Sequence, residues 1–513
     1  MTRLANVAPA AAWEHYAWSE FAELPGKERA LAVLPVYGFA DHGLGQPLDV
    51  EEVVGNELLH RAVRSSSAAI LFRILPPLRF ALAPYPHTFF GVDPETAHDL
   101  IREIATSVQA AGFRKLVFFS TSPWNEELVD AASRDSRANL GLQTFVINLS
   151  GLGLDFHPTS DRRAHAQAAA AHVLGAAPKP VTRAGESRDV DFRPGCFLEP
   201  APTAADPSLP GAELLEDASQ HLGRLFAEID ARAPLNRKEP HAPLTLPAHS
   251  APPFPPSAHV WPDYRPRYLA GFTRDELAAL PGKDHALVIV PTGAIEQHGH
   301  HLPVGVDALL GQAWLERALP KLPVDAPVFV APPITYGKSN EHLGFPGTVY
   351  ISAKTLRRLL LAIAAQLHAL GFRRIALLNT HGGNSAVLVY TLREIQTSLG
   401  VTAGMLGGYA RPVLPLQEAE FGFHAGEWET SLMLACNPEL VRMDRALCEY
   451  PARVDDPGEL RPENAPAIFS WITSDVSVSG VMGDATVATG EKGRQWFDEA
   501  STTLAGRIEA LLG

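Results

Sequence analysis

The sequence contains few cysteines and no long apolar run. Its three cysteines, Cys196, Cys436 and Cys448, form neither a CxxC pair nor the closely spaced framework of a disulfide-stabilised secreted domain. No stretch approaches the roughly 18 uninterrupted apolar residues of a membrane-spanning helix, and the N-terminal residues lack the apolar core of a signal peptide. We therefore expect a soluble, cytoplasmic protein.

Positive charge is also scarce. The chain has 43 lysines and arginines against 57 aspartates and glutamates, which gives a net charge of −14. An acidic surface suits neither nucleic-acid phosphates nor anionic membranes, so we expect neither as a partner. The 46% hydrophobic and 19% charged residues of this 513-residue chain are typical of globular proteins and indicate roughly two to four domains.

One passage of the sequence occurs twice. Residues 23–43, ELPGKERALAVLPVYGFADHG, return at residues 279–299 as ALPGKDHALVIVPTGAIEQHG. Further pairs follow in the same order: VVGNELLHRA (53–62) with LLGQAWLERA (309–318), AAGFRKLVFFSTSPWN (110–125) with ALGFRRIALLNTHGGN (369–384), and HAQAAAAHVLGA (165–176) with HAGEWETSLMLA (424–435). Matches in one order over this length indicate a tandem duplication.

The duplication predicts domains at residues 1–232 and 269–513, joined by a linker at 233–268. The linker is crowded with proline, which fixes φ and removes a hydrogen-bond donor, so we expect it to be extended. Short apolar runs such as HALVIVP and RRIALLN predict buried parallel strands, and residues 352–372 predict an amphipathic helix. The expected fold class is α/β, with helices on both faces of a mostly parallel sheet and ligands at the carboxyl ends of its strands.

Polar loops follow the predicted strands of the second copy. PTGAIEQHGHHLPVGVD (291–307) offers Glu296, His298, His300, His301 and Asp307, NTHGGN (379–384) adds His381, and HAGEWETS (424–431) adds His424, Glu427 and Glu429. Imidazole and carboxylate together favour a divalent transition metal such as zinc or manganese. Another loop, GKSNEHLGFPGT (337–348), is expected to face a substrate. Each loop alone is compatible with an ordinary polar turn, but their joint occurrence favours a metal site.

Together these segments, with GVMGDATVATGEKGR (480–494), make residues 270–512 resemble the creatininase family of metal hydrolases. The resemblance implies a three-layer α/β/α sandwich with a dinuclear metal site. It implies metal ligands at Glu296, His298, Asp307, His381 and Glu429. Asp307 is the expected bridging carboxylate. Creatininase has a further glutamate ligand two residues after the strand-end histidine, a position held here by Gly383, so the fifth ligand is assigned to Glu429.

The same resemblance assigns the remaining roles. His424 and Glu429 are expected to be catalytic, with His424 relaying protons. Substrate-binding residues are expected at Ser339, Glu341, His342, Gly382, Gly383 and Phe423. Two divalent ions per chain, zinc, manganese or iron, would lower the pKa of a bridging water and polarise a substrate carbonyl. The implied reaction is hydrolysis of a small amide, cyclic or a formamide.

Creatinine itself is not the expected substrate. Creatininase has a Trp-Asp pair just before its HAG segment, whereas residues 421–423 here are Phe-Gly-Phe. Hydrolytic ring opening of an oxidised cyclic sugar, inositol ketone or lactone is the alternative reaction, because the same centre can attack any carbonyl. A scaffold protein with a relic metal site is the non-enzymatic alternative. Creatininase-like enzymes are oligomeric, so we expect a homo-oligomer that binds a small-molecule substrate.

The first copy lacks most of the expected ligands. In the alignment Glu296 corresponds to Ala40, His298 to His42, Asp307 to Glu51, His381 to Ser122 and Glu429 to Ala170. We therefore predict that residues 1–232 form a degenerate, catalytically inactive domain that packs against the second copy and completes its pocket. Binding of a regulatory ligand by the first copy is the alternative.

Overall fold

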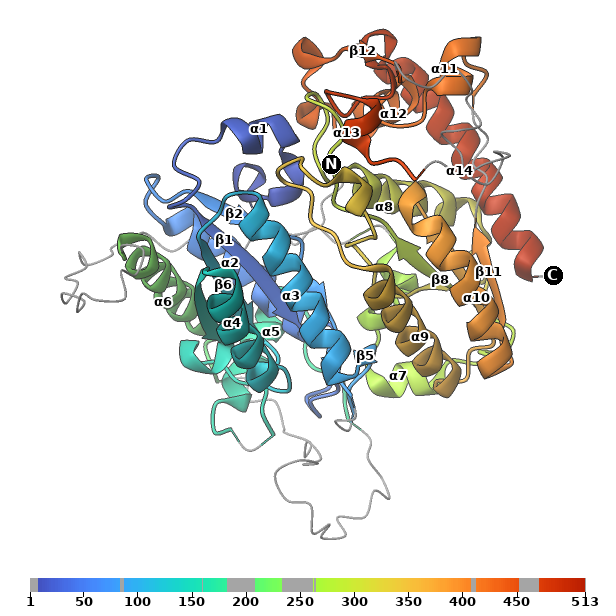
Figure 1. Ribbon diagram of the computed structural model, residues 1–513. Helices are drawn as coiled ribbons and strands as arrows, with labels where there is room; N and C mark the ends of the chain where they lie inside the picture. The colour runs from blue at the N-terminus through green and yellow to red at the C-terminus, as the bar shows by residue number, and fades with distance from the viewer. Residues whose placement is uncertain are drawn as a thin grey trace.

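The computed structural model describes residues 8–83, 87–158, 160–181, 208–232, 262, 264–406, 412–451 and 470–512. The linker predicted at 233–268 lies mostly outside the described residues, and the domain boundaries stay a prediction. We call residues 8–232 the first half and residues 264–512 the second half. Figure 1 shows the two halves side by side, the first coloured blue to green and the second yellow-green to red.

A parallel sheet forms the centre of the first half. Its strands are β1 (Leu31–Tyr37), β2 (Phe72–Ile74), β3 (Leu78–Arg79), β6 (Lys115–Ser120) and β7 (Gln143–Asn148). They lie in the order β2-β1-β6-β7, and β3 also pairs with β1. The helices are α1 (Trp18–Glu23), α2 (Val50–Ser65), α3 (Pro94–Ala110), α4 (Glu126–Leu140), α5 (Arg163–Leu174) and α6 (Gly211–Ala231). The short strands β4 (Ala81–Leu82) and β5 (Gly91–Val92) form a separate parallel pair.

The second half repeats this plan. Its parallel strands are β8 (Leu287–Thr292), β9 (Val328–Val330), β10 (Arg374–Asn379) and β11 (Thr402–Leu406), in the order β11-β10-β8-β9. Its helices are α7 (Arg274–Ala279), α8 (Val306–Ala318), α9 (Ala353–Ala369), α10 (Ser385–Leu399), α11 (Leu416–Phe421), α12 (Glu427–Cys436), α13 (Thr473–Val476) and α14 (Gly490–Leu512). The short strands β12 (Cys448–Glu449) and β13 (Gly483–Asp484) pair antiparallel.

The two sheets share their strand register. Leu31 of β1 pairs with Lys115 of β6, and Leu287 of β8 pairs with Arg374 of β10. These are the positions that the sequence alignment makes equivalent. The repeat seen in the sequence is therefore a repeat of the folded unit.

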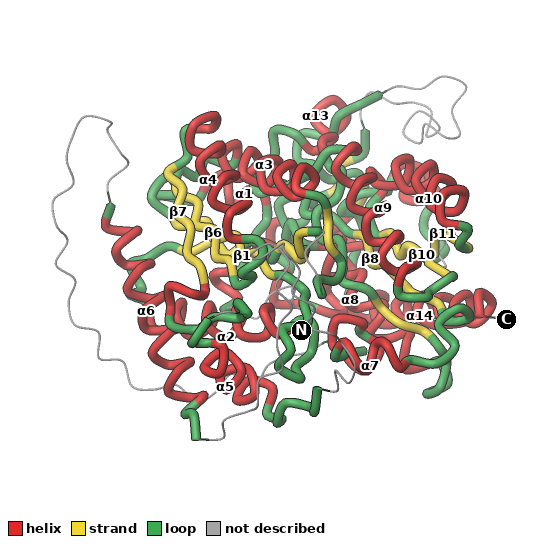
Figure 2. Tube along the Cα trace, turned by 90° about the horizontal axis from the view of Figure 1, so that it is seen from below, coloured by secondary structure: helices red, strands yellow, loops and turns green. Residues whose placement is uncertain are grey.

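Helices cover both faces of the sheets. Figure 2 shows the sheets in one middle layer, with α3, α4, α9 and α10 on one side and α2, α5, α6, α8 and α14 on the other. The predicted three-layer α/β/α fold is confirmed. Layers of this kind bury the parallel strands on both faces, which is why all six residues of β8 are buried.

The predicted amphipathic helix at 352–372 is α9. It begins where the Ser352 hydroxyl accepts a hydrogen bond from the Thr355 N–H, as an N-cap does. It ends at Ala369, just before Gly371 takes a φ of 101°, which favours glycine. Its apolar face packs in the core. None of the helices that the structure describes is long and apolar enough to cross a membrane.

The halves exchange backbone hydrogen bonds around a pseudo-two-fold axis. Val304 donates its N–H to the Tyr16 carbonyl at 2.8 Å, and Gly305 donates to Glu14 at 3.0 Å. The same pair of bonds recurs at the equivalent positions of the other half, Leu48 to Phe272 at 3.1 Å and Asp49 to Ala270 at 3.0 Å. A reciprocal contact of this kind is typical of a symmetric dimer interface. Here it lies within one chain.

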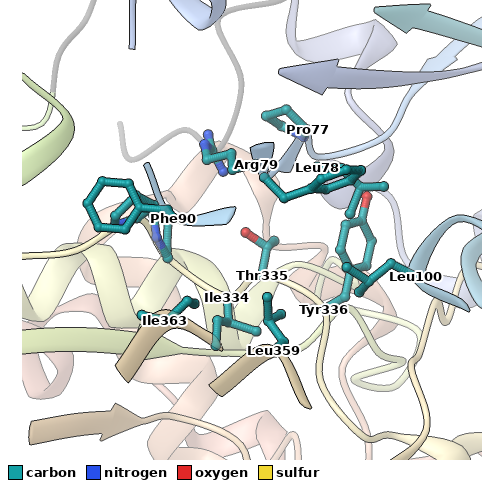
Figure 3. A pocket seen from close by; sticks show the side chains of 13 residues that line it. Pro77, Leu78, Arg79, Phe90, Leu100, Ile334, Thr335, Tyr336, Leu359 and Ile363 are labelled. Atoms are coloured by element: carbon teal, nitrogen blue, oxygen red, sulfur yellow. The ribbon is translucent and has the colours of Figure 1, made fainter. Parts of the chain in front are cut away.

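Apolar side chains of both halves pack together at the contact between them. One core cluster of buried apolar residues runs through both halves. A cavity of about 30 Å³ remains where Pro77–Arg79 face Ile334–Tyr336, as Figure 3 shows. A cavity of this size holds at most a water or two.

Glu14 is the least favourable buried group at this contact. Its side chain has no exposed surface, and neither carboxyl oxygen has a hydrogen-bond partner. Burial outweighs its own backbone N–H and Arg79, and raises the pKa of Glu14 to about 8. The folded protein therefore keeps a proton that the unfolded chain has released above the ordinary value of 4.5. The free energy of unfolding therefore falls as the pH rises from 4.5 to about 8.

We predict that Glu14→Gln raises the melting temperature, and that the gain grows between about pH 5 and pH 8. The gain in free energy of unfolding near pH 8 should be roughly 1–3 kcal/mol, because one pKa unit is worth about 1.4 kcal/mol. Thermal unfolding at several pH values measures it. The exposed Glu28 supplies the control, since Glu28→Gln should change little at any pH. An equal gain at all pH values would show that Glu14 is not protonated in the folded protein.

Candidate metal centre

The predicted ligands come from loops at the carboxyl edge of the second sheet. The ends of β8 and β10 lie side by side, because Thr292 pairs with Asn379. The loop after β8 carries Glu296 and His298, and α8 follows with Asp307 in its first turn. His381 lies two residues beyond β10. This is the edge where ligands bind in open α/β sheets.

Two groups of side chains meet at Asp307. Glu296, Asp307 and His381 form one group, and His298, Asp307 and Glu429 form the other, with the ligand atoms of each group within 4.8 Å of one another. His381 Nδ1 lies 3.1 Å from a Glu296 oxygen, and His298 Nε2 lies 3.8 Å from oxygens of both Asp307 and Glu429. The arrangement suits two divalent ions with Asp307 between them.

The charges of the cluster call for a cation. Burial, together with the carboxylates of Glu296 and Glu429, raises the pKa of Asp307 well above its usual range. Asp307 Oδ2 and His298 Nε2, which point into the cluster, have no hydrogen-bond partner. Buried carboxylates that repel one another are stabilised by a metal ion. The residues therefore fit the metal centre that the sequence predicted.

The histidines present their lone pairs to this centre. His298 Nδ1 lies 3.0 Å from the Glu296 carbonyl, which leaves Nε2 facing the cluster. His381 Nε2 lies 3.0 Å from the Lys338 carbonyl, which leaves Nδ1 facing inward. Burial lowers the pKa of His298 to about 4, so its ring is neutral at pH 7. A ligand histidine needs this orientation and this charge state. For His381, burial is outweighed by the carboxylates of Glu296 and Glu341, which raise the pKa well above its usual range, so binding of a metal ion there would release a proton.

His424 lies over the cluster. Its ring centroid is 4.3 Å from that of His298 and 4.6 Å from that of His342. Nε2 lies 2.8 Å from the Gln297 carbonyl, and Nδ1 lies 3.9 Å from Glu296 Oε1. Burial, with His298 and His342 beside it, holds the pKa of His424 well below its usual range. His424 Nε2 also lies 3.0 Å from the Gln297 amide nitrogen, and the neutral ring carries its one proton on either of its two nitrogens.

The residues predicted to bind substrate take several positions. Ser339 and Glu341 lie at 3.1 and 3.4 Å from His381 Nε2, and Glu341 forms a further possible ligand group with Glu296 and His342. His342 Nε2 is 3.4 Å from Glu296. A side chain at Gly383 would collide with the Glu341 carboxylate, whereas one at Gly382 would meet open space. Phe423 packs its ring 5.8 Å from that of Trp471.

Some polar residues of the predicted loops lie elsewhere. His301 Nε2 contacts the Thr430 hydroxyl at 2.8 Å, and the His300 ring packs at a tilt against Trp18 of the first half. Glu427 pairs with Lys492 at 2.5 Å. Their types and spacing matched metal ligands, but the loop conformation turns them away from the cluster.

Gln297 is a member of the site that the sequence reasoning missed. Its side chain has no exposed surface. The amide nitrogen lies 3.0 Å from His342 Nδ1 and 3.0 Å from His424 Nε2, and it donates to the Gly480 carbonyl at 3.1 Å. Its place between Glu296 and His298 in the sequence was the available signal.

The corresponding place in the first half is filled by its own side chains. His42 Nε2 pairs with Glu51 Oε1 at 2.9 Å, and the Gly38 N–H donates to the other Glu51 oxygen at 2.7 Å. Arg163 donates to the His42 carbonyl. Among the described residues, groups of three or more possible metal ligands occur only in the second half. That the first half is inactive stays a prediction.

Buried histidines and carboxylates at the strand ends of an α/β sheet define the class of metal-dependent hydrolases. The family model of creatininase, creatinine amidohydrolase, matches residues 14–195 and 270–508. The chain belongs to the creatininase family, as the motifs predicted.

Several characterised hydrolases resemble the chain. Mycofactocin precursor peptide peptidase of Mycolicibacterium smegmatis is 34% identical over 225 residues, which cover 44% of this chain and 84% of that protein. Creatinine amidohydrolase of Pseudomonas putida is 31% identical over 271 residues, covering 48% and 94%. 3-dehydro-scyllo-inosose hydrolase of Thermotoga maritima is 29% identical over 235 residues, covering 41% and 72%. The chain is a metal-dependent hydrolase.

Solved structures of creatininase also match. One of creatinine amidohydrolase has 26% sequence identity and a TM-score of 0.40, and covers 48% of this chain and 97% of that chain. A manganese form has 27% identity and a TM-score of 0.39, and covers 48% and 98%. A form with zinc at both positions is known as well.

Metal content tests the ligand set. We predict about two ions per chain for the wild type, loss of both in Asp307→Asn because this residue serves both groups, and loss of about one in His381→Ala. Elemental analysis after purification without chelator measures the content. The control is Ser122→Ala, at the position equivalent to His381, which should leave the content unchanged. Full occupancy in Asp307→Asn would contradict the bridging role.

Proposed function

We propose that the chain hydrolyses an amide C–N bond at a dinuclear centre between Glu296, His298, Asp307, His381 and Glu429. The observation that carries the proposal is that Asp307 joins two of the four possible ligand groups among the described residues, one with Glu296 and His381 and the other with His298 and Glu429. Two bound divalent ions, zinc, manganese or iron, would supply an activated water and polarise the substrate carbonyl. The protein would hold the ions through oriented ligands and exclude bulk water by burial.

His424 is the proposed proton carrier. Its Nδ1 faces the cluster, 3.9 Å from Glu296 Oε1, and the proposed relay uses the tautomer in which Nε2 donates to the Gln297 carbonyl and Nδ1 accepts. Nδ1 can therefore take a proton from the attacking water and pass it to the leaving nitrogen. Glu429 Oε2 accepts the Ala425 N–H at 2.6 Å, which ties the second ligand group to the turn beside His424. The two residues expected to be catalytic are thus held together.

Two of the relatives, the peptidase and the amidohydrolase, are named for cleaving a bond to nitrogen. These names support an amide substrate. Phe421 and Phe423 replace the residues that precede the HAG segment in creatininase, which argues against creatinine. Phe423 directly precedes His424 and packs with Trp471. This aromatic pair favours an apolar group next to the scissile amide, whether in a small cyclic amide, a formamide or a peptide.

Ring opening of an oxidised cyclic sugar or inositol derivative is the second candidate. Its support is the resemblance to 3-dehydro-scyllo-inosose hydrolase. The products separate the two reactions, since only amide hydrolysis releases an amine. A panel of cyclic amides, formamides, short peptides and oxidised cyclic sugars, assayed with zinc or manganese, therefore tests both. Metal loading without turnover of any member would favour the scaffold alternative.

We predict that His424→Gln lowers kcat about 10²- to 10⁴-fold, because the proton relay is lost. Metal content should be retained, since His424 is not in the proposed ligand set. The matched control is His165→Gln, at the equivalent position of the first half, which should keep wild-type kcat. Wild-type turnover in His424→Gln would exclude His424 as the proton carrier.

A further inference from the structure

A short segment of the first half contacts the loops of the metal centre in the second half. We call residues 13–23 the brace. Trp13 is fully buried, and its Nε1 donates to the Gly347 carbonyl at 2.8 Å. Gly347 has a φ of 95°, and a side chain there would collide with the ring of Phe21. The brace therefore packs closely on the 337–348 loop.

The same segment contacts the loop before α8. The carbonyls of Glu14 and Tyr16 accept the N–H groups of Gly305 and Val304. Asp307 follows two residues later, in the first turn of α8. The position of the proposed bridging ligand is thus set in part by the backbone of the other half.

Trp18 makes the third contact. Its ring centroid is 4.6 Å from that of His300 and 5.1 Å from that of Phe345. Its Nε1 donates to the Ser479 carbonyl at 3.0 Å. One side chain of the first half therefore joins three separate segments of the second half.

The Ser479 contact leads to the proposed proton carrier. The next residue, Gly480, accepts the Gln297 amide at 3.1 Å, and the same amide nitrogen lies 3.0 Å from His424 Nε2 and from His342 Nδ1. A side chain at Gly480 would collide with the Gln297 amide, so the turn and the amide are in close contact. A displaced 479–480 turn would displace Gln297 and with it His424.

We propose that Trp18 is a positioning residue for catalysis in the second half, acting through the 479–480 turn and Gln297 on His424. The first half, in which no ligand group is found among the described residues, would then serve the reaction through its brace. This inference rests on the proposed function for its effect on turnover. Its structural part, the coupling of Trp18 to the turn, does not.

The residue of the second half that is equivalent to Trp18 makes a different kind of contact with the degenerate site. Arg274 takes the place of Trp18 in the second half, and it lies 3.6 Å from Asp41 in the loop of the degenerate site. An ion pair there replaces the ring contacts and the indole N–H bond. Arg274 therefore provides a matched control for Trp18.

The test compares Trp18→Ala, Trp18→Phe and Arg274→Ala in the full-length chain loaded with zinc or manganese. We expect Trp18→Ala to lower kcat about tenfold with a smaller change in KM, because small displacements of catalytic groups reduce rates by one to two orders of magnitude. Metal content should not change. Trp18→Phe keeps a ring but loses the N–H donor, so its kcat should lie between those of the wild type and Trp18→Ala. Arg274→Ala should match the wild type.

A double-mutant comparison identifies the route. If Trp18 acts through Gln297, Trp18→Ala should have almost no further effect on kcat when Gln297 is already replaced by leucine. Independent, multiplicative losses would overturn the proposed route. Unchanged kcat and KM in Trp18→Ala, with only a lower melting temperature, would reduce Trp18 to an interface residue and overturn the proposal.

Amide hydrogen exchange needs no substrate. It therefore tests the coupling of Trp18 to the 479–480 turn separately from the proposed function. We expect Trp18→Ala, but not Arg274→Ala, to speed exchange in peptides covering residues 296–305 and 477–482. Faster exchange there in a chain that turns over no substrate would support the coupling and refute the proposed function. Unchanged exchange in these peptides would refute the coupling itself.

Discussion

Mutual repulsion among buried carboxylates is the constraint on which the second half depends. Glu296, Asp307 and Glu429 come from three segments of the chain, and an oxygen of each lies within 4.0 Å of His298 Nε2. Such a cluster is unfavourable unless positive charge joins it. The surrounding carbonyls and amide turn the histidine lone pairs inward, so the protein is arranged to receive that charge as metal ions. The strand ends, the glycine turns and the first turn of α8 all serve to bring these groups together.

At the corresponding place in the first half, the carboxylate already has partners. Glu51 meets His42 and a backbone N–H, so its charge is already compensated. The two halves thus share strand register and interface but differ in one local balance of charge. The two halves keep similar packing surfaces, which depend on many apolar contacts, while four of the five proposed ligand positions carry different residues in the first half.

Much of the fold could be predicted because its signals are local. Apolar runs marked β8 and β10, and Ser352 marked the start of α9, since capping and periodicity depend on neighbouring residues. The proposed ligand positions followed from the resemblance of the histidine and carboxylate motifs to those of the creatininase family. The role of Gln297 and the contact of Glu341 with His381 could not be predicted, because they depend on how distant loops pack. Trp18 and Ser479 lie 461 residues apart in the sequence, and no local pattern marks their contact.

The brace has a consequence for how the protein behaves at low abundance. Between separate subunits, such a segment would leave its neighbour when the assembly dissociates. Joined in one chain, it acts at a high effective concentration that dilution does not change. Each chain thereby has one metal centre and one supporting half, always in equal number. The supporting half can change at the positions equivalent to the proposed ligands as long as the brace is kept.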